Sequence, residues 1–442
     1  MDAMKRKNDG IWLKPVSEED LLTWQGLVLG PALSPYAFGF FSFSIKFPAE
    51  YPSCAPVVHF LTTNGGKTRF NPNLYADGKV CLSILGTWRG ESGELWSSVQ
   101  NCHSVMVSIQ SLLDDEPYHN EPGFEKQRSV SFDSFVTSLE GSAKASRDYN
   151  LKITHETVRV AVCDVLEEIL NRSEVEEAAN GFCDIIKWHF LLYCSRYLEI
   201  VDQHAEVEGE FEIMEFEYQR NWMSGSFNFK ELRSRILLIK ESLVKELVQW
   251  QREGVESSKH QSFACQHILS AFEVLDTKLI ACISLKYCTD HIYIFQKWSK
   301  LSNAGISAAP REANKFVWDV TIMGDLDGGW YENGMYQLEI TFPPNFPDCM
   351  PRPRFQTQMF HPQIDEDGFP FLSVSMTDSK NVQAIISDVH SLLKNPPSPD
   401  PRTWVNKKAA DMYFGGDQEE FKRTVRRYAQ RSMEQSKKIR DG

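Results

Sequence analysis

The chain has 442 residues, more than one ordinary hydrophobic core accommodates, which indicates two or three domains. With 42% hydrophobic and 24% charged residues, it has the composition of a folded protein rather than a disordered one. The formal net charge of −13 opposes a phosphate backbone, and no long Lys/Arg stripe reverses it locally. Nucleic acid is therefore not an expected partner.

No apolar run reaches the roughly 18 residues that a bilayer span needs, and the stretch from Met1 to Gly10 is polar and charged, unlike a secretion signal. We expect no membrane partner and a cytoplasmic location, with the nucleus as a second one. The ten cysteines form no CxxC pair and no Cys/His cluster. In a reducing compartment they are expected to be free thiols, with no metal site.

The chain contains an internal repeat. Landmark residues of the first part recur late in the chain with almost unchanged spacing: Trp24 and Gly30 as Trp318 and Gly324, and Tyr36, Gly39, Tyr51 and Pro56 as Tyr331, Gly334, Phe346 and Pro351. Apolar and polar residues alternate at 41–47 and again at 336–342, which predicts a half-buried antiparallel strand in each copy. Each alternating run ends in Phe-Pro followed by an aromatic-Pro pair, where proline ends the strand ladder.

Between the copies the pattern becomes helical. Residues 155–170, 181–204 and 228–252 carry apolar positions three and four residues apart, with breaks at 208–209 and 224–225 and an expected end at Gly254. Another helical stretch runs from about 262 to 301. We predict a domain at 1–150, a helical extension at 151–255, a helical linker at 256–300 and a second copy of the first domain at 301–442.

The segment from Phe70 to Leu85, FNPNLYADGKVCLSIL, resembles the active-site signature of ubiquitin-conjugating enzymes, with Asn73 eight residues before Cys81 and Gly78 between them. With the landmarks above, the likeness covers residues 24–123, including an amphipathic helix at 104–113. The resemblance implies an α+β protein with two ubiquitin-conjugating folds, each an antiparallel β-meander packed on helices, separated by the helical extension.

The resemblance assigns the chemistry to Cys81, which would accept ubiquitin or a ubiquitin-like modifier as a thioester and pass it to a substrate lysine. A thiolate suits this reaction because it is both a nucleophile and a good leaving group. Asn73 would donate to the oxyanion of the tetrahedral intermediate. The alternative is that Asn73 only braces the loop.

An acceptor lysine, with a free pKa of about 10.4, must lose its proton before it attacks. In the family an acidic residue before a proline lines the acceptor path, which puts Glu121 in that place. His119 is a second candidate, because histidine is the side chain most often used as a general acid or base. Alternatively, both only shape their loop. Cys54 and Cys102 lack the asparagine context and are expected to be core or loop residues.

Beyond the core, residues 117–125, 149–150 and 155–164 resemble a family member with a large helical C-terminal extension. That likeness implies charging by the second, less common ubiquitin-activating enzyme and acceptance of a tandem ubiquitin-like modifier. The expected partners are the modifier, the activating enzyme and a ubiquitin ligase. No cofactor is expected, because the activating enzyme uses the ATP.

Three departures from the family pattern stand out. Only 23 residues precede Trp24, and Pro15 is among them, so the usual N-terminal helix is expected to be missing or short. Ser53 and the Ser97–Val99 segment replace the apolar residue and the Ser-Pro-Ala turn that RING ligases grip, which argues against RING pairing of that kind. Asn71 stands where most members have histidine.

In the second copy, Gln363 falls on Asn73, Gly368 on Gly78 and Phe371 on Cys81. Phenylalanine cannot form a thioester, so this copy is expected to bind a partner or to serve structure, although Asp400-Pro401 remains at the acidic position. Cys349 lies before the motif and is expected to pack rather than react. The sequence thus predicts one active and one inactive conjugating domain; the alternative is a non-catalytic ubiquitin-binding scaffold.

Overall fold

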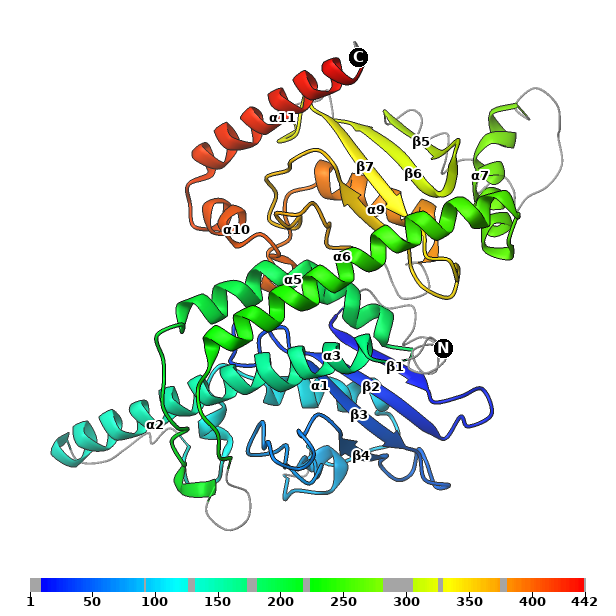
Figure 1. Ribbon diagram of the computed structural model, residues 1–442. Helices are drawn as coiled ribbons and strands as arrows, with labels where there is room; N and C mark the ends of the chain where they lie inside the picture. The colour runs from blue at the N-terminus through cyan, green and yellow to red at the C-terminus, as the bar shows by residue number, and fades with distance from the viewer. Residues whose placement is uncertain are drawn as a thin grey trace. The chain divides into compact units, whose positions relative to one another are not determined.

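The computed structural model describes residues 9–90, 93–125, 132–172, 181–217, 223–280, 305–324, 329–373 and 380–440 (Figure 1). The chain divides into two compact units, one of residues 1–186 and 197–239 and one of residues 187–196 and 240–442. Two long helices contribute to both units: α5 (Cys183–Gln203) and α6 (Phe229–Lys259).

The first unit contains a four-stranded antiparallel meander in the order β1 (Ile11–Pro15), β2 (Thr23–Leu29), β3 (Phe40–Lys46) and β4 (Val57–Phe60). The alternation predicted for 41–47 is confirmed, because Phe41, Phe43 and Ile45 are fully buried while the serines between them are partly exposed. Pro15 lies in β1, which pairs only with β2. An edge strand tolerates proline, because one side of its backbone has no ladder partner.

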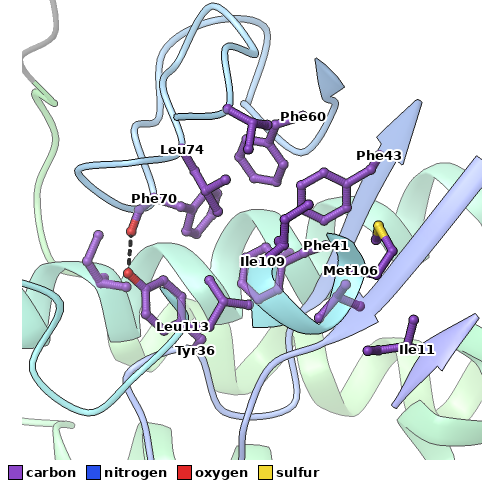
Figure 2. Packing of buried hydrophobic residues seen from close by; sticks show 14 of the residues in the cluster. Ile11, Tyr36, Phe41, Phe43, Phe60, Phe70, Leu74, Met106, Ile109 and Leu113 are labelled. Carbon is purple, nitrogen blue, oxygen red and sulfur yellow. Dashed lines mark hydrogen bonds between the residues drawn. The ribbon is translucent and has the colours of Figure 1, made fainter. Parts of the chain in front are cut away.

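Helix α1 (Cys102–Leu112) packs on β1 and β2. It begins at a capping box in which the Asn101 side chain accepts from the Ser104 amide and the Ser104 side chain binds back to Asn101. Its inner face buries Val105, Met106 and Ile109 in a core that the sheet fills with aromatic rings (Figure 2). This core supports the loop that follows β4.

The helical segments predicted after the first domain are confirmed. Helix α2 (Phe132–Val158) continues through a π turn (Arg159–Asp164) into α3 (Val165–Leu170), followed by α5 and α6. The expected end at Gly254 is wrong, since α6 runs on to Lys259. A side chain at Gly254 would place its Cβ 2.6 Å from Phe316 Cβ, so this glycine permits close packing on the second unit's sheet instead of ending a helix.

Between α5 and α6, the described residues 209–217 and 223–227 pair with each other and are called here the extension loop. The Phe227 amide donates to the Gly209 carbonyl and the Phe211 amide to the Gly225 carbonyl, so the two predicted breaks pair with each other. A short 3₁₀ turn (Glu215–Glu217) ends in the buried Glu217, whose carboxylate binds Lys152 of α2 at 2.6 and 2.8 Å. The extension loop is thereby fixed to the first unit.

The second unit repeats the antiparallel meander, with β5 (Ile306–Arg311), β6 (Asn314–Met323), β7 (Met335–Thr341) and β8 (Arg352–Phe355) in that order. Its helices are α7 (Phe263–Ile280), α9 (Val382–Lys394), α10 (Lys407–Phe414) and α11 (Gln418–Arg440). Phe346-Pro347 is a cis peptide bond, as is Tyr51-Pro52 at the matching place in the first unit. The part of the predicted linker helix beyond residue 280 lies outside the described residues.

From Asp9 onward, the described chain enters β1 directly, and the expected place of an N-terminal helix falls on residues 1–8, outside the described part. Among the described helices, none has the length and apolarity that a membrane crossing requires.

Candidate active site around Cys81

Residues 69–85, between β4 and α1, are called here the motif loop, and this loop brings Asn73 and Cys81 together. The Cys81 amide donates to the Asn73 carbonyl at 2.9 Å, and the Asn73 Nδ2 donates to the Cys81 carbonyl at 2.9 Å. Gly78 turns the chain between them with a φ of 88°, and an added Cβ there would lie 2.2 Å from the His59 ring. Only glycine fits this turn, because a side chain meets both backbone strain and a clash.

The Asn73 side chain therefore braces the loop in this structure, as one of the two interpretations from sequence expected. Its Nδ2 carries two hydrogens, and the bond to the Cys81 carbonyl uses one of them. The second remains beside the thiol-bearing residue, so bracing and oxyanion binding are compatible roles for one side chain. Cys81 itself is only 2% exposed.

Asn71 connects the motif loop to the core. Its Oδ1 accepts from the Asn73 amide at 2.9 Å, while its Nδ2 donates to the Tyr36 hydroxyl and to the Leu112 carbonyl at the end of α1. The Tyr36 hydroxyl donates in turn to the Phe70 carbonyl at 2.7 Å (Figure 2). These hydrogen bonds fix the position of the motif loop relative to α1.

Glu121 and His119 lie in the segment after α1, where a 3₁₀ turn (Pro117–Asn120) precedes Glu121. The Glu121 carboxylate binds Arg69 Nη2 at 3.0 Å and its side chain is 22% exposed. Burial raises the pKa of Glu121, and the Arg69 charge opposes that rise. His119 Nδ1 donates to the Phe124 carbonyl at 2.7 Å, which leaves Nε2 as its acceptor atom.

Two side chains of this site were missed from sequence: Tyr75 and Arg69. Burial raises the pKa of the Tyr75 phenol, the Arg69 charge opposes this, and the neighbouring Cys81 and Glu121 add to it, Cys81 also through a side-chain hydrogen bond. Tyr75 therefore lies beside both the thiol and the acid. Tyr75 could have been picked out from sequence, because it lies inside the motif, two residues after Asn73. Nothing in the sequence around Arg69 marks that residue.

The second unit builds the same loop without the thiol. The Phe371 amide donates to the Gln363 carbonyl at 2.8 Å, and the Gly368 amide to the Asp365 carbonyl, as Cys81 and Gly78 do to Asn73 and Tyr75. Phe371 thus occupies the backbone position of Cys81. Gln363 differs from Asn73, since its Oε1 accepts from the Ser398 amide.

At the acidic position of the second unit, the Asp400 carboxylate caps the turn that follows it and binds the Arg402 guanidinium. His361 replaces Asn71 and makes the equivalent bonds: its Nδ1 accepts from the Gln363 amide, and its Nε2 donates to the Leu392 carbonyl. Burial lowers the pKa of His361 to about 4, so it is neutral at pH 7.

The family model for the ubiquitin-conjugating enzyme matches residues 1–134 and 293–429, more than half of the 442-residue chain. The chain belongs to the ubiquitin-conjugating enzyme family. Both matched stretches contain one meander and one motif loop, so the two-copy α+β fold predicted from sequence is confirmed. The predicted domain boundaries at 150, 255 and 300 stay predictions.

Among its relatives in the family, human ubiquitin-conjugating enzyme E2 Z is 36% identical over 247 residues, which is 56% of this chain and 62% of the relative. The same enzyme from Xenopus tropicalis is 36% identical over 54% of this chain and 68% of its own length. These matches confirm the likeness carried by residues 117–125 and 155–164. The chain spans about three fifths of the human relative, 62% of its length.

The human dual E2 ubiquitin-conjugating enzyme/E3 ubiquitin-protein ligase BIRC6 is 42% identical over 191 residues, 43% of this chain and 4% of that protein. A solved E2 domain of a Toxoplasma gondii ubiquitin-conjugating enzyme aligns with 32% of this chain and 97% of its own, at 22% identity and a TM-score of 0.26.

Several of the other cysteines in the described part of the chain are deeply buried. Burial raises the pKa of Cys102, Cys163 and Cys194 to about 12, which leaves them protonated and unreactive at neutral pH. Cys54 is exposed and Cys349 partly buried, both near the aromatic-Pro loops. Among the described residues, no group of three His, Cys, Asp or Glu side chains could hold a metal ion.

Proposed function

We propose that the first unit is a conjugating enzyme that carries ubiquitin or a ubiquitin-like modifier as a thioester on Cys81. The observation that supports this most is the paired contact between Asn73 and Cys81, which puts an amide donor beside the thiol-bearing residue. The second unit repeats the loop with Phe371 and has no sulfur to acylate at that position.

In the first step, the Cys81 thiolate attacks the carbonyl of the modifier's C-terminus, held as a thioester on the activating enzyme's cysteine. A new S–C bond forms, and the activating enzyme's sulfur leaves as a thiolate that takes up a proton. A second hydrogen of the Asn73 amide would stabilise the oxyanion of the intermediate. Because Cys81 is 2% exposed, access of the modifier to its sulfur requires a local rearrangement of the site.

In the second step, a substrate lysine amine attacks the Cys81 thioester, an amide bond forms and the Cys81 sulfur leaves. The amine proton passes to the Glu121 carboxylate or to water, and the buried surroundings of that site favour the neutral amine. His119 would contribute through its free Nε2.

The partners of this function are the modifier, an activating enzyme and a ligase, and we place it in the cytoplasm, with the nucleus as a second location. The human relative's name says that it conjugates ubiquitin. The likeness to that enzyme supports charging by the second ubiquitin-activating enzyme. The activating enzyme consumes the ATP, so the chain itself needs no cofactor. We assign the second unit a binding or structural role.

A charging assay tests the proposal. The full chain is incubated with either activating enzyme, ATP and modifier, and a thiol-sensitive adduct is expected that disappears in Cys81→Ala and persists in Cys102→Ala. Absence of the adduct with both activating enzymes, together with saturable ubiquitin binding that survives Cys81→Ala, would replace the proposal with the non-catalytic scaffold.

A further inference from the structure

Arg69 is a buried arginine at the start of the motif loop, with 3% of its surface exposed. Its Nη2 donates to the Pro72 carbonyl at 2.6 Å and to Glu121 Oε2 at 3.0 Å. The guanidinium also lies over the Tyr75 ring, 4.3 Å from the centroid. One side chain therefore joins the motif loop, the acidic residue and the ring beside the thiol.

The extension loop contributes a second ring to this arrangement. The Arg69 guanidinium is 5.6 Å from the centroid of Phe216. Phe216 packs in turn against Tyr118 and Tyr149, with ring centroids 5.6 and 5.5 Å apart, so its own position is set by the segment that carries Glu121 and by α2. Arg69 thus touches one ring from the motif loop and one from the extension loop.

Two further contacts hold the extension loop against Arg69. The Arg69 amide donates to the Met223 sulfur at 3.1 Å. Next to Phe216, the buried Glu217 binds Lys152, whose ammonium also donates to the Glu212 carbonyl at 3.0 Å. A buried ion pair resists separation, because pulling out one partner leaves an uncompensated charge.

The ion pair between Arg69 and Glu121 affects the charge state of Glu121. Burial raises the pKa of this carboxyl, and the charge and hydrogen bond of Arg69 oppose that rise. Without the guanidinium, burial would act alone and the carboxylate would take up a proton at higher pH. Arg69 therefore holds the acid in place and favours its charged form.

We propose that Arg69 is a positioning residue for lysine transfer, and that the extension loop, through Phe216, forms part of the transfer site by holding Arg69 on Glu121. This rests on the proposed function, since Glu121 matters only if Cys81 transfers its cargo. The helical extension then serves the chemistry of the first unit and does more than enlarge it.

The experiment separates charging from discharge. Preformed thioester of the full chain is mixed with free lysine from about pH 6 to about pH 9, and its loss is followed in a single turnover. Per molecule of thioester formed, Arg69→Ala is expected to discharge on the order of 10-fold to 100-fold more slowly than wild type. The ratio of variant to wild-type rate should be smallest at the acid end, because loss of the guanidinium lets burial raise the pKa of Glu121 further.

Three comparisons keep the test specific. Arg235→Ala removes another arginine of the first unit, paired with Asp164 and Glu167 far along the chain from the motif, and should discharge like wild type. Phe216→Leu keeps apolar volume but removes the ring, and should reproduce part of the defect even if Arg69→Ala does not fold. Thermal unfolding of each variant reports its folded state.

The decisive comparison is a double variant. If Arg69 acts through Glu121, Arg69→Ala should slow discharge little in a Glu121→Gln background. An equal slowing in both backgrounds, or a discharge rate of Arg69→Ala within about twofold of wild type at every pH, would overturn the inference while leaving the proposed function intact. Failure of the wild-type chain to charge at all would refute both.

Discussion

Replacing Asn73 with alanine separates the two roles of this side chain by their magnitudes. The change removes the Nδ2 bond to the Cys81 carbonyl and leaves the backbone bond from the Cys81 amide to the Asn73 carbonyl in place. A bracing bond of this kind contributes about 0.5–1.5 kcal/mol to stability. An oxyanion donor is worth about 2.7–4 kcal/mol in the transition state, a rate factor on the order of 100 to 1,000.

We therefore expect Asn73→Ala to discharge its thioester on the order of 100-fold more slowly while losing about 1 kcal/mol of local stability. Single-turnover discharge to free lysine measures the first quantity. Hydrogen exchange of the amides at 70–81 measures the second, and is preferable to one unfolding curve because a chain with two compact units need not unfold in one step.

Asn150→Ala is the matched control. Its Nδ2 also donates to a backbone carbonyl, that of Asp115 at 2.8 Å, but it does not contact Cys81. It should show a similar loss of stability and no loss of rate. A discharge rate of Asn73→Ala within about threefold of wild type would refute the oxyanion role and leave Asn73 as a brace alone.

Three further changes follow from the packing. Gly78→Ala should lower the melting temperature more than Gly65→Ala: both glycines have positive φ, costing about 1–2 kcal/mol for alanine, but only at Gly78 does the new Cβ meet other atoms. Equal losses in the two variants would contradict the clash. Lys152→Met should lower the free energy of unfolding in urea by about 3–5 kcal/mol, because it leaves Glu217 buried without its partner. Lys152→Met/Glu217→Leu should recover much of that stability. No recovery would argue against charge burial as the cause. Burial raises the pKa of Asp365 from 3.8 to about 8, so the folded state binds the proton more tightly and stability should fall as pH rises across that window. Asp365→Asn should flatten this fall, as read from hydrogen exchange in the second unit, and an unchanged slope would exclude Asp365 as its source.

Sequence patterns predicted the elements in which one physical cause dominates. The alternation at 41–47 survives in β3 because one face of that strand is fully buried. The strand at Ile11–Pro15 was missed, because proline argues against a strand unless the strand is known to lie at an edge. Gly254 misled in the same way, since a helix glycine can mark either an end or a close contact.

The residues of the candidate site show the same contrast between local sequence patterns and contacts that form only in the folded chain. Asn73 and Cys81 could be proposed because a motif of fixed spacing carries them, and Glu121 because it is the acidic residue before a proline after the following helix. Arg69 could not, because its meaning comes from Phe216, a ring far away along the chain that reaches it only through the folded extension loop. Side-chain contacts over such separations leave no local period or spacing to detect.

The exchange of Asn71 for His361 between the two copies shows that two residue types can fill one hydrogen-bonding role. An amide and a neutral imidazole each have an acceptor atom and a donor atom, and here both side chains connect a loop amide to the carbonyl near the end of a helix. The two residues thus satisfy one distance and one polarity pattern, and the backbone bond that Cys81 makes to Asn73 is made by Phe371 to Gln363 in the second copy. A sequence signature that demands histidine at this position would therefore miss the first copy of this chain, although its loop is held in the same way.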